Sequence, residues 1–426
     1  MQQAPPPIPY GFDASNPSHP TMYYLGIDVG GSHITLDLVD AQTFERLPGS
    51  TVREPLDTHV NPSAVLAVFE RAVRACAATA GGPGQVLGVG LAIPGPFNYG
   101  AGVCRITPQQ GKYEQCFGVN FRQTLSNALD TPAKPVVFNN DAACFALGEY
   151  FRGGAQGFSR AVVITLGTGF GASFIKNGRP HPGGSDGVPP GGELWNAPYR
   201  GTIAEEFIST RWFIAEWQLR TGQAIAGGKE IAQAALAGDP AALAIYRDFG
   251  ANLADFILPH LAAFQADALV IGGNLARDWD LFHPALRAAI PAGIAVKPCE
   301  LGEQAPIYGA ALALTLVDAA AVTPAPLPAG FPGLEGLPAQ LAAHPQVRLD
   351  GPADAPWKDI TAVLDRALRA AGKKAVWFDV DAARADGVLT ADLASIRHDP
   401  LADLSIVSGH GAAQVPWPDA LTLRLP

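Results

Sequence analysis

The sequence lacks the features that mark several large classes of protein. Its five cysteines are scattered, their number is odd and no Cys-x-x-Cys pair occurs, so we expect no disulfide framework. Acidic residues outnumber basic ones by 39 to 29 without a basic stripe, which argues against a nucleic acid as partner. No apolar run approaches the ~20 residues of a membrane span, and the Pro-rich first 22 residues do not look like a signal peptide. These absences predict a soluble, cytoplasmic protein with no membrane partner.

Common nucleotide-binding fingerprints are missing too. No G-x-x-x-x-G-K-[ST] loop occurs anywhere in the chain. What the chain has is two glycine hairpins, at residues 25–40 and 161–176, each an apolar strand, a turn of Gly, Ser or Thr, and a second strand. Because a strand and not a helix follows the glycines, neither hairpin is a dinucleotide-binding fingerprint.

The turns of the two hairpins are suited to binding anions. Glycine has no Cβ to keep a ligand away, and successive main-chain N–H groups form a concave nest for negative charge. Two such turns roughly 140 residues apart suggest a duplicated domain that clamps a polyphosphate from both sides. Either turn alone could equally be an ordinary hairpin. The residues concerned are Gly30, Gly31 and Ser32 in the first turn and Gly167, Thr168, Gly169 and Gly171 in the second.

Between the hairpins, Asn140 and Asp141 stand where a strand at 136–138 ends and a helix begins. One interpretation of Asp141 is a plain helix N-cap. The other is a general base, because a hydroxyl becomes a good nucleophile only when its proton has an acceptor within hydrogen-bond reach. The helix N-terminus favours the ionised carboxylate that such a base needs. Glu149, about two turns further on, is expected to be a structural hydrogen-bonding residue.

The order and spacing of several motifs resemble the ROK family of repressors, open reading frames and sugar kinases. The likeness covers about residues 23–319 and implies an α/β protein with the two-lobed, actin-like and hexokinase-like (ribonuclease H-like) fold, built on a duplicated sheet. The motifs are Asp28-Val-Gly-Gly-Ser32, Ile93-Pro-Gly-Pro96, Asn140-Asp-Ala142 with Gly148-Glu149, Leu166-Gly-Thr-Gly-Phe-Gly171, Gly192-Glu193, Ile271-Gly-Gly273 and Gly309-Ala-Ala311.

The resemblance implies an ATP-dependent hexose kinase. The sugar would lie in a cleft between the lobes, and Asp141 would accept the proton of its hydroxyl, the 6-hydroxyl if the sugar is glucose or a related hexose. The glycine turns, with Gly272 and Gly273, would hold ATP, and Asp28 would lie near Mg²⁺ through water. Family members form homodimers, which we expect here. By the same resemblance, the sugar hydroxyls would be held by Asn120, Asn140, Asp141, Glu193, Asn196 and Glu205.

One region departs from the family pattern. ROK proteins typically carry a Glu, a His and a cysteine-rich zinc knuckle here, followed by a further Glu. This chain keeps Glu193, has Asn196 in place of the His and has none of the knuckle cysteines, so we expect no structural zinc. Glu205 matches the later Glu, although the adjacent Glu206 leaves the register open. Trp195 and Tyr199 are candidates to pack the loop instead. Zinc-free branches of the family include polyphosphate-using glucokinases.

The predicted domain organisation follows from these motifs and from Pro/Gly-rich stretches. Helices are predicted at 202–220 and 229–264, and an irregular loop at 97–119. The last 90 residues, outside the likeness, read as a small α/β module with a helix at 360–372, a strand at 375–378 and candidate strands at 404–407 and 421–425. Two interpretations of this module stay open: it is incomplete, or it needs the rest of the chain to fold. The expected divisions are an N-terminal arm (1–22), the N-terminal lobe (23–139), the C-terminal lobe (140–303), a returning helix (304–319), a linker (320–336) and a C-terminal extension (337–426).

Three alternatives to an ATP-dependent kinase stay open. The first is a sugar-responsive repressor, although the 22-residue arm is too short for a helix-turn-helix domain. The second is a catalytically inactive sugar-binding or regulatory protein, which the Asn196 substitution keeps in play. The third is a glucokinase that uses polyphosphate, although no lysine-rich run supplies a groove for it. The identity of the hexose cannot be read from the sequence, because related sugars differ by single hydroxyls.

Overall fold

The computed structural model of the protein describes residues 20–107, 111–129, 134–317, 344–350, 357–383, 402, 404–409, 412, 415 and 421–424. These residues form two compact units. The central unit holds residues 141–312, and the N-terminal unit holds the described residues up to 140 together with those from 313 on. The predicted arm and linker fall almost wholly outside the described residues. None of the helices in the described ranges has the length and apolar character needed to cross a lipid bilayer.

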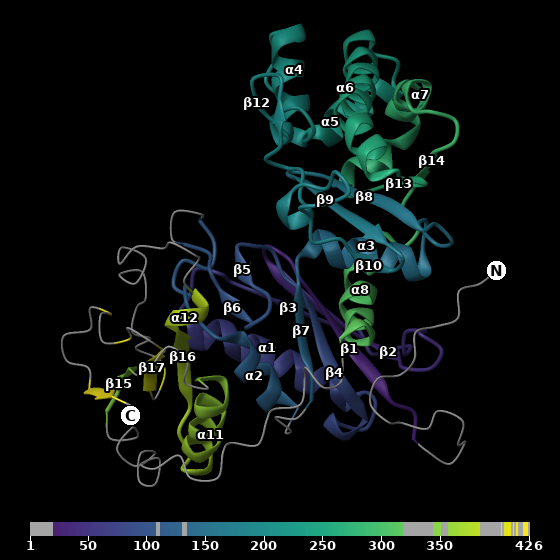
Figure 1. Ribbon diagram of the computed structural model, residues 1–426. Helices are drawn as coiled ribbons and strands as arrows, with labels where there is room; N and C mark the ends of the chain where they lie inside the picture. Colours follow the sequence, from purple (N-terminus) through teal and green to yellow (C-terminus); the bar gives the residue numbers. More distant parts are fainter. Residues whose placement is uncertain are drawn as a thin grey trace. The chain divides into compact units, whose positions relative to one another are not determined.

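The helices and strands are shown in Figure 1. The helices are α1 (Pro62–Ala78), α2 (Phe121–Ala128), α3 (Asp141–Arg152), α4 (Thr210–Thr221), α5 (Gly228–Leu236), α6 (Pro240–Phe264), α7 (Trp279–Ala289), α8 (Ala305–Ala313), α11 (Trp357–Ala370) and α12 (Val380–Ala383). The strands are β1 (Tyr23–Val29), β2 (His33–Asp40), β3 (Val52–Pro55), β4 (Val86–Ala92), β5 (Phe97–Asn98), β6 (Val103–Cys104), β7 (Val136–Asn139), β8 (Arg160–Leu166), β9 (Phe170–Lys176), β10 (Arg179–Pro180), β11 (Pro198–Tyr199), β12 (Thr202–Ile203), β13 (Ala268–Gly272), β14 (Ala295–Pro298), β15 (Gln346–Asp350), β16 (Ala375–Asp379), β17 (Leu404–Ser408) and β18 (Leu421–Arg424).

The N-terminal unit is built on a five-stranded sheet of order β3-β2-β1-β4-β7. The first glycine hairpin is the antiparallel pair β1–β2, and β4 and β7 continue the sheet parallel to β1. The register places Asp28 beside Ala92 and Ala92 beside Asn139. Because parallel strands end at the same edge of a sheet, Asp28 and the Asn139–Asn140 step belong to one sheet edge.

The central unit repeats this arrangement. Its sheet has the order β10-β9-β8-β13-β14, with the second glycine hairpin as the antiparallel pair β8–β9 and with β13 and β14 parallel to β8. Figure 1 shows α3 on one side of this sheet and α4 to α7 gathered on the other. The register pairs Gly272 with Thr165, so the Gly272–Gly273 turn follows at the same edge as the glycine turn after β8. The predicted duplicated sheet is therefore present.

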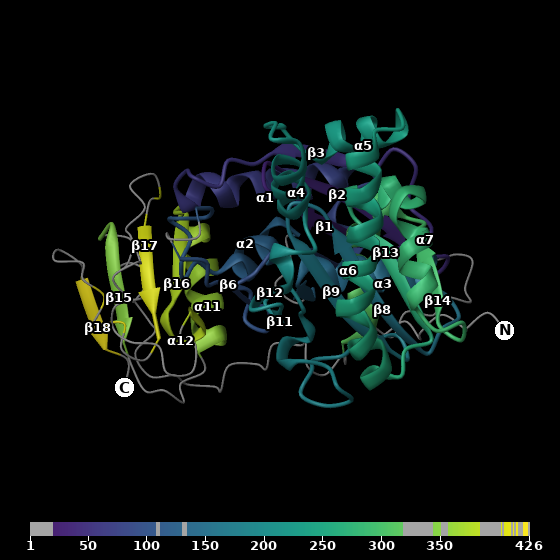
Figure 2. The same cartoon turned by 90° about the horizontal axis from the view of Figure 1, so that it is seen from above.

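The C-terminal extension forms the predicted α/β module, here called the C-terminal module (described residues from 344 on). Its four strands are all parallel in the order β16-β17-β15-β18, and α11 packs against them (Figure 2). The sequence pattern predicted α11, β16, β17 and β18 but missed β15. That strand alternates as a half-buried strand should, with Val347 and Leu349 buried, but it follows the Pro/Gly-rich stretch closely and has only five residues.

Three local predictions were wrong. Residues 202–209 are not α-helical: Thr202–Ile203 pairs with Pro198–Tyr199 as a two-stranded hairpin, Ala204–Glu206 is a 3₁₀ turn, and α4 begins only at Thr210. Residues 229–264 form two helices, because Gly238 takes a positive φ of 88° and Asp239 caps a new helix that starts at Pro240. The stretch 97–119 holds the short hairpin β5–β6 where an irregular loop was expected.

Candidate active site

The first glycine turn leaves its backbone open. The N–H of Gly30 donates to the carbonyl of His33 at 2.9 Å, which closes the turn. Gly31 and Ser32 are exposed, and a Cβ added to Gly31 would meet no atom within 4 Å. Asp28 is half-buried, two residues before the turn. A small ligand with negative charge can therefore approach the backbone at Gly31 without displacing any neighbour.

Two asparagines of the N-terminal unit lie near the ends of its elements. Asn120 is the N-cap of α2, and its Oδ1 accepts from the N–H of Gln123 at 3.3 Å. Asn140 follows β7, and its Nδ2 donates to Oη of Tyr99 at 3.5 Å. Both side chains are amides that donate and accept hydrogen bonds, as the recognition of sugar hydroxyls requires.

Asp141 is the first residue of α3 in the central unit. Its Oδ1 accepts from the N–H of Ala142 at 3.0 Å, so the carboxylate lies over the helix N-terminus. The next residue brings this helix end close to the second hairpin, because a Cβ added to Gly171 would lie 3.1 Å from Cβ of Ala142. Asp141 and the second glycine turn are thus neighbours within one unit.

Residues outside the hairpin fix the second glycine turn through hydrogen bonds to its main chain. The carbonyl of Gly167 accepts from the N–H of Thr210 at 2.8 Å and from its hydroxyl at 2.9 Å. Oε2 of Glu205 accepts from the N–H of Phe170 at 2.9 Å, and Glu205 also forms an ion pair with Arg211. The tip of the turn, with Thr168 and Gly169, is exposed. These contacts fix the turn and leave its outer face available to a ligand.

Three of the predicted nucleotide-binding glycines have a packing role. A Cβ on Gly171 would lie 2.3 Å from Oγ1 of Thr165, and one on Gly272 would lie 2.2 Å from the ring of Phe145. Gly273 takes a φ of 85°, and its Cβ would lie 2.3 Å from the carbonyl oxygen of Leu166. Steric crowding alone therefore requires glycine at these three positions, whereas no such crowding is present at Gly31 and Gly167.

Hydrogen bonds within the loop that carries Glu193, Asn196 and Glu205 fix its conformation. Oε2 of Glu193 accepts from the indole N–H of Trp195 at 2.8 Å, and the N–H of Glu205 donates to the carbonyl of Trp195 at 3.0 Å. Glu193 is half-buried, and Asn196 is exposed. The loop therefore brings the two glutamates of the predicted sugar site together with the base of the second glycine turn.

A polar and aromatic clamp holds the same loop against α6. The hydroxyl of Tyr199 donates to Oδ2 of Asp255 at 2.8 Å, and Arg200 donates to Oδ1 of Asn252 at 2.8 Å. The guanidinium of Arg200 lies over the ring of Tyr199 at 4.9 Å and over that of Phe207 at 5.7 Å. Burial and the hydrogen bond to Asp255 raise the pKa of Tyr199 to about 12, so this hydroxyl stays a donor at neutral pH.

Glu149 has the structural role expected for it. Its buried carboxylate accepts three main-chain N–H bonds, from Gly154 at 2.8 Å, Glu300 at 3.0 Å and Leu301 at 2.8 Å. These bonds tie the end of α3 to the segment that leads into α8. Thr210, Arg211 and Arg200 were not predicted as site residues. Thr210 bonds to Gly167 and Arg200 to Asn252, more than 40 residues away in the chain, so no local sequence pattern indicates these contacts.

Residues 24–314, about two thirds of the chain, match the ROK family. The chain belongs to the ROK family. The match ends before the C-terminal module, which thus lies outside the family domain.

Relatives within the ROK family include named kinases. The chain is 28% identical over 326 residues to a glucokinase from Streptomyces coelicolor, and the alignment covers 67% of this chain and 96% of that protein. It is 27% identical over 319 residues to an N-acetyl-D-glucosamine kinase from Haemophilus influenzae, with 68% and 98% covered. The crystal structure of a ROK hexokinase from Thermus thermophilus matches with a TM-score of 0.57 and 25% identity, covering 68% of this chain and 97% of that one. The predicted ROK membership and sugar-kinase fold are confirmed.

Side-chain contacts to α6 hold the loop around Tyr199 and Arg200, where this ROK chain departs from the zinc-knuckle pattern. The described residues contain no group of three or more His, Cys, Asp or Glu side chains that could hold a metal ion. The clamp of Tyr199 and Arg200 occupies the part of the loop where the typical ROK pattern has its zinc knuckle. A nucleotide-bound Mg²⁺ makes different demands, since it keeps several waters and takes only one or two carboxylates from the protein. Asp28, half-buried beside an open glycine turn, fits that demand.

Proposed function

We propose that this protein transfers the γ-phosphoryl group of ATP to a hydroxyl of a hexose, the 6-hydroxyl of glucose or of a related sugar. The enzyme class, a carbohydrate kinase, follows from ROK membership together with relatives named glucokinase and N-acetyl-D-glucosamine kinase. The observation that carries the proposal is the place of Asp141, at the N-terminus of α3 and next to the second glycine turn. A base for the acceptor and a turn for the donor phosphates thus occur side by side.

The proposed roles follow from the chemistry of each group. Asp141 accepts the proton of the attacking hydroxyl, which makes the oxygen a better nucleophile. Asn120, Asn140, Glu193 and Asn196 orient the sugar through its other hydroxyls. Glu205 would do the same with the lone pairs that its bonds to Phe170 and Arg211 leave over, and it also supports the phosphate turn.

The two glycine turns supply main-chain N–H groups to the phosphates of ATP, where Gly31 and Gly167 leave room for them. Asp28 would hold Mg²⁺ through water, and a bound Mg²⁺ neutralises phosphate charge during transfer. Most of the catalysis is then positioning and charge stabilisation by residues of this chain. The tightly packed glycines Gly272 and Gly273 would line the part of the ATP site that contacts the adenosine.

A coupled assay of ADP release with Mg-ATP against glucose, mannose, fructose, N-acetylglucosamine and N-acetylmannosamine tests the function. We expect turnover on at least one hexose and a loss of at least about a hundredfold in kcat for Asp141→Ala. Asp141→Asn keeps the shape of the side chain and is expected to be equally poor, because an amide does not accept the proton. Turnover that survives in both variants would exclude Asp141 as the base.

The donor and the assembly are tested separately. Replacing ATP with polyphosphate in the same assay distinguishes a polyphosphate-dependent glucokinase, and we expect ATP to be preferred. Sugar binding by calorimetry without any turnover, on either donor, would favour the inactive sugar-binding or regulatory protein. The homodimer and the cytoplasmic location stay predictions, which sedimentation velocity and cell fractionation would check.

A further inference from the structure

Residues 118–120 of the N-terminal unit lie between strands from two distant parts of the chain. On one side, Cys104 of β6 accepts from the N–H of Gly118 at 2.8 Å and donates to the carbonyl of Val119 at 3.1 Å. On the other side, the N–H of Asn120 donates to the carbonyl of Trp377 at 2.9 Å, and Asp379 donates to the carbonyl of Gly118 at 2.8 Å. Two isolated antiparallel bridges, Val119 with Phe378 and Val103 with Asn120, therefore connect β16 of the C-terminal module to the β5–β6 hairpin.

Alternate side chains of β16 enter two different cores, as expected where both faces of a strand are covered. Val376 and Phe378 are buried in the core of the N-terminal unit, together with Val119 and Phe121. Trp377, between them, is buried in the module's own core beneath α11. One face of the module's sheet is thus part of the core that surrounds the start of α2.

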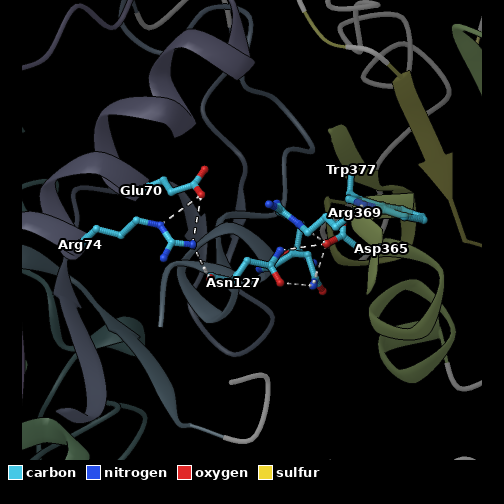
Figure 3. Close-up of polar contacts among 8 residues, drawn as sticks. Glu70, Arg74, Asn127, Asp365, Arg369 and Trp377 are labelled. Carbon is cyan, nitrogen blue, oxygen red and sulfur yellow. Dashed lines mark hydrogen bonds and ion pairs between the residues drawn. The ribbon is translucent and has the colours of Figure 1, made fainter. Parts of the chain in front are cut away.

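A buried carboxylate adds a polar link between the module and α2 (Figure 3). Asp365 of α11 is fully buried, and its Oδ2 accepts from Nδ2 of Asn127 at 2.8 Å and from Nε2 of Gln123 at 3.4 Å. Its Oδ1 accepts from the indole N–H of Trp377 at 2.7 Å, and Nε of Arg369 donates to Oδ2 at 2.8 Å. A buried carboxylate without donors is costly, so this set of four donors specifies one geometry.

These links converge on Asn120. Gln123 and Asn127 stand one turn apart on α2, and Asn120 is the residue that caps this helix. Asp365 holds the face of α2, and through Trp377 it holds the strand whose carbonyl accepts the main-chain N–H of Asn120. We propose that the C-terminal module is a working part of the sugar site, in which Asp365 and Trp377 are positioning residues for Asn120. The inference rests on the proposed function, since it takes Asn120 as a sugar ligand.

The experiment exchanges the side chains of Asp365 and Asn127, which hydrogen-bond to each other, in the full-length chain. Asn127→Asp places a second carboxylate against Asp365 and should push α2 away from the module. In the double variant Asp365→Asn with Asn127→Asp, the new amide at position 365 still accepts from Trp377 through its oxygen, and its NH₂ group donates to the new carboxylate at position 127. Gln123 keeps its acceptor on residue 127, whereas Arg369 loses its acceptor on residue 365. Arg366→Ala is the matched control, because Arg366 is exposed on the same helix, next to Asp365. Asn127→Ala, which only removes a donor, serves if Asn127→Asp does not fold.

The readouts are the Kd of the hexose by calorimetry without ATP, the KM of hexose and of ATP, kcat and Tm. For Asn127→Asp we expect the Kd and KM of the hexose to rise about tenfold, with kcat and the KM of ATP within about twofold. The double variant should recover part of the hexose affinity, because it restores the bond between residues 365 and 127 but not the bond from Arg369. Arg366→Ala should equal the wild type. A purely structural module would lower the Tm of Asn127→Asp and leave the Kd of the hexose unchanged, which would overturn the proposal.

Failure of the proposed function gives a different pattern. If the wild type binds a hexose but never phosphorylates it, the proposed kinase activity is excluded. The hexose Kd values of the variants then still test the positioning role of the module in full. If the wild type phosphorylates a hexose and every variant has the same Kd for it, the kinase activity stands and the positioning role is excluded. Recovery of Tm without recovery of the Kd in the double variant would also count against the module.

Discussion

Oε2 of Glu205 accepts the main-chain N–H of Phe170 at 2.9 Å, directly after the exposed tip of the second glycine turn. The same carboxylate forms an ion pair with Arg211 at the start of α4. The main-chain N–H of Glu205 donates to the carbonyl of Trp195, in the loop that carries Glu193 and Asn196. One residue therefore connects the part of the central unit proposed to bind the sugar with the part proposed to bind the phosphates.

Glu205→Ala should impair both ligands. Loss of the carboxylate leaves the N–H of Phe170 without its acceptor, which loosens the turn, and a missing hydrogen bond to a charged group is worth about 1.5–3 kcal/mol. We expect the KM of ATP and of the hexose each to rise about tenfold or more in steady-state assays. Glu206→Ala is the control, because Glu206 is exposed and forms its ion pair with Arg211 at 3.6 Å, away from the glycine turn. Equal effects of both substitutions would contradict the role given to Glu205.

The glycines should divide into two groups when replaced by alanine. Gly273→Ala puts a Cβ 2.3 Å from the carbonyl oxygen of Leu166 at a φ of 85°, so we expect a loss of stability of about 2 kcal/mol or more. Gly31→Ala meets no atom within 4 Å and should change the free energy of unfolding by less than about 0.5 kcal/mol.

Thermal unfolding and the KM of ATP separate these two glycines. Gly31→Ala is expected to raise the KM of ATP while Tm stays the same, because the new methyl group lies where a phosphate would approach the backbone. An unchanged KM of ATP in this variant would show that the first turn does not contact the donor.

The clamp of Tyr199 and Arg200 should hold the loop of Glu193 and Asn196 without a metal. Arg200→Ala removes the bond to Asn252 and the stacking on Tyr199 and Phe207, and we expect the KM of the hexose to rise about fivefold, with faster cleavage of the loop in limited proteolysis. Arg247→Ala, another exposed arginine, is the control. A chelator such as EDTA should leave Tm unchanged, whereas a fall in Tm on chelation would reveal a structural metal.

Acid should weaken the central unit through His260 of α6. Burial lowers the pKa of this imidazole below its usual 6.5, and its ring lies 5.1 Å from that of Phe256. The unfolded chain therefore binds a proton more readily than the folded one, so the contribution of His260 to stability is complete above about pH 6.5 and is lost as the pH falls toward the folded pKa. We expect Tm to fall between about pH 7 and pH 5 with a smaller slope in His260→Gln. Equal slopes would exclude this histidine as a source of acid sensitivity.

Local sequence patterns were sufficient for the two hairpins, the strand–helix step at Asn140–Asp141 and the order of motifs. Strand alternation and glycine turns act over a few residues, so their signal survives without knowledge of the fold. The same patterns failed at the start of the helix predicted from residue 202, where Thr202 and Ile203 pair with β11 and so override helical propensity. They also could not separate the glycines that pack from the glycines that leave the backbone open, because that difference depends on neighbours such as Phe145 and Leu166.

The sequence by itself determined the ROK likeness, the candidate base Asp141 and the lack of the knuckle cysteines. Only the tertiary structure decided how the loop is held without the knuckle and where the C-terminal module belongs. Nothing in the local pattern around Asp365 indicates that Asn127 and Gln123, more than 230 residues earlier, supply its donors. Long-range contacts of this kind arise from pairing strands such as β16 with residues 118–120, and a single sequence carries no local trace of which strand edges meet.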